Sequence, residues 1–209
     1  MSSKGLTFRG GIHPPHFKEQ TEKSSIEVGL LPNEVVIPLH QHIGAPCEPT
    51  VKVGDKVKVG QKIGDTKAFV SVPIHSSVSG VVIKIANKNS PSGAKVKSII
   101  IQTDEKQEVS EDINPKGDIE SLDKDELLKI VQEAGITGMG GAGFPTHVKL
   151  SPPEDKKIDI VIINGAECEP YLTSDHRMMI EYPDKVLMGT KAVMKVLPSP
   201  TTSARKTPL

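Results

Sequence analysis

Four glycines within six positions, followed by one lysine, are the residues whose types and spacing most clearly suggest chemistry in this chain. They are Gly138, Gly140, Gly141 and Gly143 in GMGGAGFPTHVKL at 138–150, and Lys149 follows six residues after the last of them. Glycines lack Cβ atoms, so the backbone N–H groups around them can approach an anion closely, and a lysine ammonium supplies the compensating charge. The pattern predicts a cradled phosphate, and the alternative is a glycine hinge between two elements.

The two best-known nucleotide motifs do not explain this loop. Its glycines match G-x-G-x-x-G, but the dinucleotide fingerprint requires a strand before the glycines and a helix after them. Here a predicted helix precedes the glycines and a Phe-Pro turn follows them. The phosphate loop of nucleotide triphosphatases requires Gly-Lys-Ser/Thr, which this stretch does not contain. His147, close to the loop, could add a further charge.

A second polar motif, NGAECEP at 164–170, comes at the end of the apolar run IDIVIIN at 158–164. The run predicts a buried parallel strand, and ligands of open α/β sheets bind beyond the carboxyl ends of such strands. Asn164, Glu167 and Glu169 are expected there. Amide and carboxylate groups suit the hydroxyls of a ribityl or ribose group, whereas an acidic surface loop is the alternative.

The elements that must position these motifs begin with a β-rich half. Paired glycines and prolines in GGIHPPHFKEQT predict that residues 1–25 are an arm without helix or central strand. Residues 26–105 contain short Val- and Ile-rich runs separated by glycines, which predict a small β sandwich or barrel. The charged residues 106–120 predict a linker.

Residues 121–197 follow the order helix, loop, strand, loop, helix, which is typical of the start of an α/β domain. Asp123 and Glu126 form a capping-box variant at the start of the first helix. The second helix is predicted at 184–197. Residues 198–209 have no periodicity and are expected to be an unstructured tail, so we expect the α/β domain to be incomplete and the chain to be a fragment or a truncated product.

The bulk composition excludes several classes of protein. Lys+Arg and Asp+Glu number 26 each, which argues against a nucleic-acid-binding surface. No apolar run reaches the roughly 18 residues of a membrane span, and the N-terminus lacks the apolar core of a secretory signal. Cys47 and Cys168 are expected to be reduced thiols, and Cys168 to be a small buried filler. Two cysteines cannot hold a four-cysteine iron–sulfur cluster within this chain.

Further candidate sites are weaker. Histidines at 13, 16, 40 and 42, the last two together with Cys47, could be metal ligands, but their spacing is loose and no metal site is predicted. The 51–83 region resembles a lipoyl or biotinyl domain, in which Lys67 would be near the modified position. No residue is predicted to be catalytic, because nothing near Cys168 is placed to activate it as a nucleophile.

The motifs, in this order, resemble a known family. G-x-G-G-A-G-F-P-T-x-x-K followed by N-x-x-E-x-E-P is similar to the flavin-binding half of the flavoprotein subunit of respiratory complex I. FRGGIHPPHFK at 8–18, PTVKVGDKVKVGQKI at 49–63 and IHSSVSGVV at 74–82 resemble the RnfC subunit of the Rnf electron-transport complex. The two resemblances together cover residues 5–197.

The resemblance implies roles for individual residues. It assigns the phosphate of flavin mononucleotide (FMN) and its surroundings to the glycine loop with Lys149, and the flavin to Asn164 and Glu167. Phe144 and Glu169 would be on the nicotinamide-nucleotide side. Met139 departs from the pattern, because the flavoprotein of complex I has an arginine there. The family continues with the rest of the α/β domain, a β-grasp-type domain and a segment carrying two four-iron clusters.

The expected fold is therefore α+β, with a lipoyl-like β barrel-sandwich domain followed by an incomplete α/β flavin-binding domain. The resemblance implies the N-terminal part of a peripheral subunit of an ion-translocating ferredoxin:NAD+ oxidoreductase. It would lie on the cytoplasmic side of the cell membrane, use FMN and NAD(H), and meet other Rnf subunits and ferredoxin. The alternative is a catalytically inactive docking fragment, and a carrier module modified at Lys67 is a third hypothesis.

Overall fold

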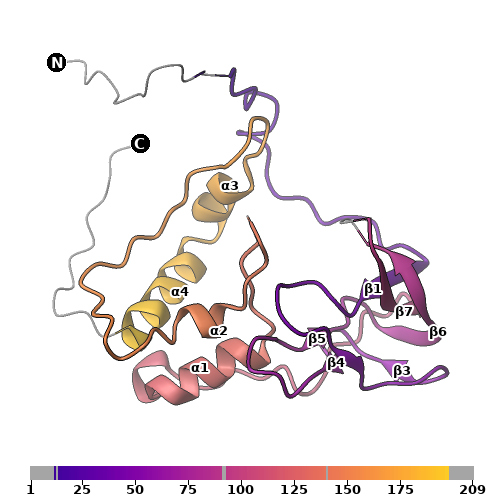
Figure 1. Ribbon diagram of the computed structural model, residues 1–209. Helices are drawn as coiled ribbons and strands as arrows, with labels where there is room; N and C mark the ends of the chain where they lie inside the picture. The colour runs from indigo at the N-terminus through magenta and orange to yellow at the C-terminus, as the bar shows by residue number, and fades with distance from the viewer. Residues whose placement is uncertain (1–11, 13, 91–92, 140, 198–209) are drawn as a thin grey trace. The chain divides into compact units, whose positions relative to one another are not determined.

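The computed structural model describes residues 12, 14–90, 93–139 and 141–197, and these residues form two compact units. The first, the barrel unit, contains residues 29–161 and 189–197. The second, the arm unit, contains residues 12–28 and 162–188. In the barrel unit the strands lie together and the long β6–β7 hairpin projects from them (Figure 1).

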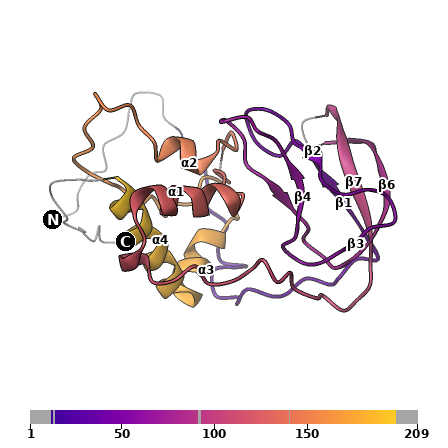
Figure 2. The ribbon, with the colours of Figure 1, turned by 90° about the horizontal axis from the view of Figure 1, so that it is seen from below.

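Two antiparallel sheets make up the β-rich part of the barrel unit. The larger has the order β1-β7-β6-β3 and the smaller the order β2-β4-β5 (Figure 2). Their bounds are β1 Glu34–Pro38, β2 Glu48–Pro49, β3 Lys56–Val57, β4 Lys62–Asp65, β5 Ile74–His75, β6 Gly80–Asn89 and β7 Lys95–Thr103. The Val- and Ile-rich runs of the sequence become the longer strands, which confirms the predicted small β domain.

The core of these sheets is built from the inward-facing β-branched residues. Ile63, Val82, Ile99 and Ile101 are completely buried, and Leu39, Cys47 and Val57 pack with them. In β1 and β7 the pairing aligns Ile37 with Ile99 and Val35 with Ile101, so one face of the larger sheet is apolar along both strands. Burying each such side chain contributes roughly 1.5–3 kcal/mol.

The helices begin after a short 3-10 turn at Ile119–Ser121. Their bounds are α1 Lys124–Glu133, α2 Thr146–Lys149, α3 Ser174–Glu181 and α4 Pro183–Val196. The predicted capping box is confirmed, because Asp123 accepts from the Glu126 amide and Glu126 accepts from the Asp123 amide, both at 2.8 Å. Leu127, Leu150 and Val196 form a second, smaller core in the barrel unit.

Two sequence predictions are wrong. The run at 158–164 forms no strand, and Ile160, Ile162 and Ile163 are 74%, 82% and 51% exposed. A parallel strand needs a neighbour to accept its backbone hydrogen bonds, and no described residue pairs with this run. Cys168 is exposed rather than a buried filler, since it lies in an open loop, and both cysteines are free thiols.

Across the described residues, no helix is both long enough and apolar enough to cross a bilayer.

Candidate functional site

The glycine motif forms a narrow loop that is closed at its base. The Gly138 amide donates to the Phe144 carbonyl at 3.0 Å, and the Thr146 amide donates to the Ile136 carbonyl at the same distance. Thr137 and Pro145 form an isolated antiparallel bridge between these contacts. The residues from 139 to 143 are therefore displayed at the tip of a fastened loop.

The backbone amides at the tip have no partner within the described chain. Met139, Gly141, Ala142 and Gly143 donate no hydrogen bond to another described residue. Gly140, also a predicted phosphate contact, is outside the described residues. A Cβ added to Gly141 would meet no atom within 4 Å, so the tip is open to an approaching group. Such successive free amides are the donors that bind an anion.

Lys149 is close to the base of the same loop. It ends α2, and its Nζ is 3.3 Å from the position that a Cβ on Gly138 would occupy. The bare backbone at Gly138 therefore gives the ammonium room. Lys149 is exposed and forms no ion pair with any described residue. Its charge is available to a ligand, as the sequence predicts.

The β domain holds the loop through backbone contacts. The Ile43 amide donates to the Gly143 carbonyl at 3.1 Å. Gly143 has φ +64°, and a Cβ there would be 3.3 Å from the Gln41 carbonyl oxygen, so a side chain would disturb this contact. His147 is buried and its Nε2 is 3.0 Å from the Phe69 carbonyl. The ring thus fastens α2 to the β domain instead of facing the loop tip.

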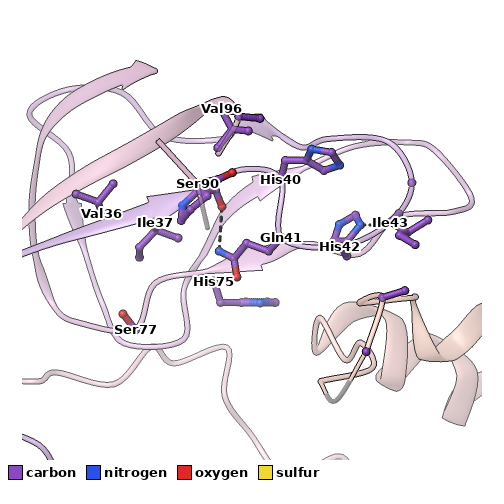
Figure 3. Close-up of a pocket in the computed structure, with 15 residues that line it drawn as sticks. Val36, Ile37, His40, Gln41, His42, Ile43, His75, Ser77, Ser90 and Val96 are labelled. Atoms are coloured by element: carbon purple, nitrogen blue, oxygen red, sulfur yellow. Dashed lines mark hydrogen bonds between the residues drawn. The ribbon is translucent and has the colours of Figure 1, made fainter. Parts of the chain in front are cut away.

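A cavity of about 1090 Å³ adjoins the loop tip (Figure 3). Gly141 and Ala142 line one side of it, and the β domain supplies the other walls through His40, Gln41 and His75. Burial, reinforced by the charge of Lys62, lowers the pKa of His75. This cavity therefore presents free amides on one side and a neutral imidazole on another at pH 7.

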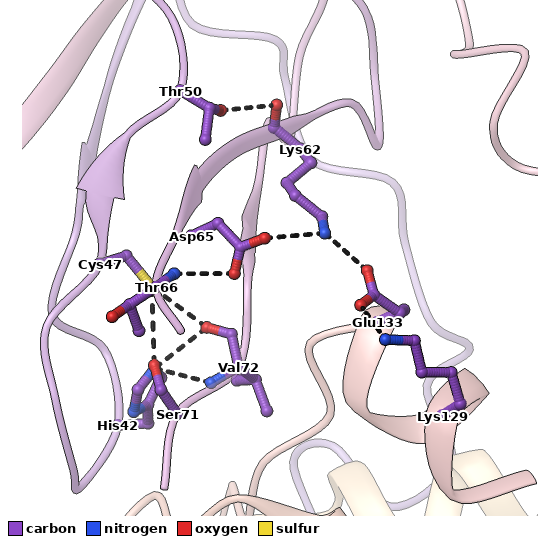
Figure 4. Close-up of polar contacts among 10 residues, drawn as sticks. All are labelled: His42, Cys47, Thr50, Lys62, Asp65, Thr66, Ser71, Val72, Lys129 and Glu133. Carbon is purple, nitrogen blue, oxygen red and sulfur yellow. Dashed lines mark hydrogen bonds and ion pairs between the residues drawn. The ribbon is translucent and has the colours of Figure 1, made fainter. Parts of the chain in front are cut away.

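A short ion-pair network connects α1 to β4 (Figure 4). Lys62 Nζ is 2.6 Å from a Glu133 carboxylate oxygen and 2.9 Å from an Asp65 oxygen, and Lys129 also reaches Glu133 at 3.3 Å. The hydrogen bond from Lys62 lowers the pKa of Glu133. Burial opposes the charge on Lys62, but its bonds to Glu133 and Asp65 outweigh this and raise its pKa. The network fixes the helix that leads into the glycine loop.

A buried group of Cys47, Ser71 and His42 could be mistaken for a nucleophilic site (Figure 4). His42 Nε2 is 3.3 Å from Ser71 Oγ, and Cys47 Sγ is 3.8 Å from the same hydroxyl. However, Ser71 donates to the Ala45 carbonyl and Cys47 to the Val72 carbonyl. Burial raises the pKa of the Cys47 thiol, which disfavours the thiolate. These side chains satisfy one another in the core, and no described cluster could hold a metal ion.

The second motif lies in the arm unit, and two of its side chains have local partners. Asn164 Oδ1 accepts from the Ala166 amide at 3.0 Å. Glu167 Oε1 accepts from the amides of Asp175 and His176 at 2.8 and 3.1 Å, and so caps α3. The Glu169 carboxylate is exposed and bonds to no described residue. Gly138, Gly143, Phe144 and Lys149 come together in one unit, and the Asn164–Glu169 motif belongs to the other.

Comparison with known proteins agrees with this division. The RnfC barrel sandwich hybrid domain matches residues 6–106, and the Nuo51 FMN-binding domain matches residues 131–203. The chain combines an RnfC-type barrel with a Nuo51-type FMN-binding segment. The resemblance inferred from the sequence is thereby confirmed, and so is the α+β fold class.

Curated relatives extend the RnfC likeness along nearly the whole chain. The chain is 51% identical over 195 residues to the RnfC subunit of the Na(+)-translocating ferredoxin:NAD(+) oxidoreductase complex of Acetobacterium woodii, covering 93% of this chain and 44% of the relative. It is 50% identical over 191 residues to the proton-translocating counterpart of Clostridium ljungdahlii, covering 91% of this chain and 42% of the relative. For the corresponding subunit of the ion-translocating oxidoreductase complex of Vibrio cholerae the values are 40% over 198 residues, 94% and 25%. The chain thus spans less than half the length of each.

Several residues with positions of consequence were missed by the sequence reasoning. Gln41 and Ile43 hold the glycine loop, and Phe17 and Lys18 contact the Glu169 segment. The contacts of Ile43 and Gln41 use the main chain and leave no side-chain pattern. Lys18 could have been found, because it is a charged residue directly after a Pro-Pro segment of unusual composition.

Proposed function

We propose that residues 138–143 and Lys149 hold the phosphate end of FMN, as the flavin-binding part of an RnfC-type subunit. The free amides at the loop tip, with an unpaired ammonium beside Gly138, are the observation that carries this proposal. The fit is chemical as well as geometric, because a phosphate dianion needs several N–H donors and a positive charge. The match to an FMN-binding domain supports the same ligand.

The chain's own residues would bind and orient the flavin. The loop amides would donate hydrogen bonds to phosphate oxygens, while Lys149 neutralises charge. Glu169, whose carboxylate is exposed, is proposed with Phe144 to face the nicotinamide nucleotide. Asn164 and Glu167 are proposed to contact the flavin, although Glu167 also caps α3. Bound flavin would supply the coupling of hydride transfer to single-electron transfer.

The wider role follows from the relatives. We propose that the whole protein is a peripheral subunit that exchanges electrons between NAD(H) and ferredoxin on the cytoplasmic side of the cell membrane. Its partners would be the other subunits of the ion-translocating complex, as the names of the relatives imply. The two four-iron clusters of the family would be held elsewhere, because this chain has two cysteines.

The test is FMN binding by the purified chain and by a Lys149→Ala variant. We expect the substitution to weaken FMN affinity at least about tenfold, equivalent to about 1.4 kcal/mol. Quenching of FMN fluorescence measures the dissociation constant. Lys157→Ala is the matched control, since Lys157 is also exposed and makes no ion pair among the described residues. Equal affinities for wild type and Lys149→Ala would refute the phosphate site.

A second candidate function is docking without flavin. The exposed isoleucines at 160, 162 and 163 favour it, because contiguous apolar surface is typical of contact with another polypeptide. In that case the chain would bind other subunits of the complex and show no flavin absorbance after incubation with FMN and gel filtration. Retained flavin would instead favour the first candidate.

A further inference from the structure

The N-terminal arm is attached to the segment that carries Glu167 and Glu169. The Tyr171 amide donates to the His16 carbonyl at 2.8 Å, which joins the two backbones. Lys18 Nζ donates to the Leu172 carbonyl at 2.7 Å and to the Glu169 carbonyl at 3.3 Å. One ammonium therefore bridges two carbonyls on either side of Tyr171, roughly 150 positions away in the sequence.

Threonine hydroxyls continue this attachment. Thr173 Oγ1 donates to Thr21 Oγ1 at 3.0 Å, and Thr21 Oγ1 donates to the Tyr171 carbonyl at 3.3 Å. Thr173 is buried, although most of its neighbours in the loop are exposed. The arm itself turns tightly here, since the Glu22 amide donates to the Lys18 carbonyl at 2.8 Å. The turn brings Lys18 and Thr21 to the same stretch of loop.

A stacked aromatic pair lies at the centre of the contact. The rings of Phe17 and Tyr171 are 4.9 Å apart between centroids and 10° from parallel. Both residues have positive φ, 51° for Phe17 and 68° for Tyr171. Bulky residues rarely adopt this conformation, and it persists only where surrounding contacts hold it. Such strain is typical of sites where a loop must have one particular shape.

The far end of the arm is fixed to α3. The Ile26 amide donates to Glu181 Oε1 at 3.0 Å, and Arg177 donates to the Glu22 carbonyl at 3.3 Å. Arg177 and Glu181 also pair with each other at 2.5 Å and are both largely buried, with side chains 15% and 21% exposed. Contacts thus run from His16 to Ile26 on the arm and from Glu169 to Glu181 on the other side.

We propose that residues 14–26 form a clasp that fixes the backbone of the 167–173 loop, and that Lys18 is its main positioning residue. The proposal rests on the proposed flavin function and adds to it a role for the arm. Lys18 binds the Glu169 carbonyl and leaves the Glu169 carboxylate free, so the clasp orients that carboxylate toward a ligand without using it. The barrel-domain match includes residues 6–28, yet this segment packs with the arm unit.

The experiment compares the 209-residue wild type with Lys18→Met, which keeps the aliphatic stem and removes the ammonium. Lys18→Arg tests rescue, because a guanidinium fork can also donate to two carbonyls. Lys23→Met is the matched control, since Lys23 is in the same turn, is exposed and contacts no described residue. Hydrogen exchange of peptides covering 164–173 reports the loop, and FMN affinity reports the site.

We expect Lys18→Met to accelerate exchange of the Tyr171 amide about tenfold and to weaken FMN binding about threefold to tenfold. Lys18→Arg should restore most of both, and Lys23→Met should change neither. Exchange of β7 amides 99–101 should be identical in all variants, which separates loop opening from unfolding.

Unchanged exchange in Lys18→Met would overturn the clasp. Faster exchange with wild-type FMN affinity would overturn the positioning role and leave a purely structural contact. If wild type itself binds no FMN, the proposed function fails and the positioning role fails with it, while the exchange data still decide whether the clasp exists. Failure of the two ideas is therefore distinguishable.

Discussion

The barrel unit and the arm unit are stabilised in different ways. In the barrel unit, Ile63, Val82, Ile99 and Ile101 are completely buried, and the glycine loop is fastened to this core by backbone contacts. In the arm unit, among the described residues, Thr173 is the sole buried side chain, and Ile162 and Ile180 are exposed. The arm unit depends on hydrogen bonds, one ion pair and one stacked aromatic pair.

The difference shows how a binding site can combine two kinds of support. Apolar burial is non-directional and scales with area, so the barrel unit can hold the glycine loop without any specific side chain. Hydrogen bonds contribute only about 0.5–1.5 kcal/mol each, so the arm unit depends on individual donors such as Lys18. Single polar substitutions should therefore matter in the arm unit, and single apolar truncations in the barrel unit.

The largest expected effect comes from truncating the same residue type in each unit. Ile101→Ala should lower the free energy of unfolding by about 2–5 kcal/mol, because it opens a cavity in the packed core. Ile162→Ala should change it by less than about 0.5 kcal/mol, since this side chain is 82% exposed. Urea denaturation measures both. Similar losses for the two variants would show that the run at 158–164 is buried in solution.

The second prediction concerns the junction between α1 and the β domain. Gly135 has φ +70°, and a Cβ there would be 2.7 Å from the Pro73 carbonyl oxygen. Gly135→Ala should therefore destabilise the protein by about 1–3 kcal/mol. Gly189→Ala is the control of opposite sign: Gly189 is inside α4 with open space around it, so alanine should stabilise by about 0.5–1 kcal/mol. Thermal unfolding curves compare them, and a harmless Gly135→Ala would contradict the close contact.

The sequence was sufficient where a pattern is local. The capping box of Asp123 and Glu126, the Val- and Ile-rich strands and the display of the glycine loop all depend on residues near one another in the chain. The run at 158–164 failed because strand formation depends on a neighbour that periodicity does not supply. Cys168 failed for a similar reason, since burial depends on what covers a loop.

The contacts that hold the candidate site were beyond the sequence for another reason. Lys18 and Tyr171 are more than 150 positions apart, and Lys18 binds carbonyls that every residue type possesses. Glu167 looked like a ligand because of its place in N-x-x-E-x-E-P, but its carboxylate caps a helix that begins seven residues later. A motif marks the loop, whereas the structure divides its residues between ligand and support.

Glu167 provides the third prediction, a polar test within the arm unit. Glu167→Ala should destabilise α3 by about 0.5–2 kcal/mol, because two amides at the helix start lose their acceptor. Hydrogen exchange at residues 175 and 176 should accelerate accordingly. Glu167→Gln retains an acceptor oxygen and should preserve most of the protection. If Gln also preserves FMN affinity, Glu167 supports the loop and its charge is not used for the ligand.

The smallest expected effect tests the charged contact of the barrel unit through pH. The Glu133 pKa is lowered in the folded state by Lys62, so the pair contributes stability above the unfolded pKa of about 4.3 and loses it as pH falls through the lower folded value. The Lys62 pKa is raised, so its share persists until pH rises above about 10.4. Glu133 is 42% exposed, and solvent screening limits the contribution to about 0.2–1 kcal/mol.

Glu133→Gln should therefore cost this amount at pH 7, and the difference from wild type should vanish near pH 3 and shrink in high salt. Urea denaturation across pH measures it. Glu154→Gln, at an exposed carboxylate with no ion pair among the described residues, should show no such pH dependence. A loss at pH 7 as large as that of Ile101→Ala would mean that the α1 junction depends on charge more than on packing, and the contrast between the two units would no longer hold.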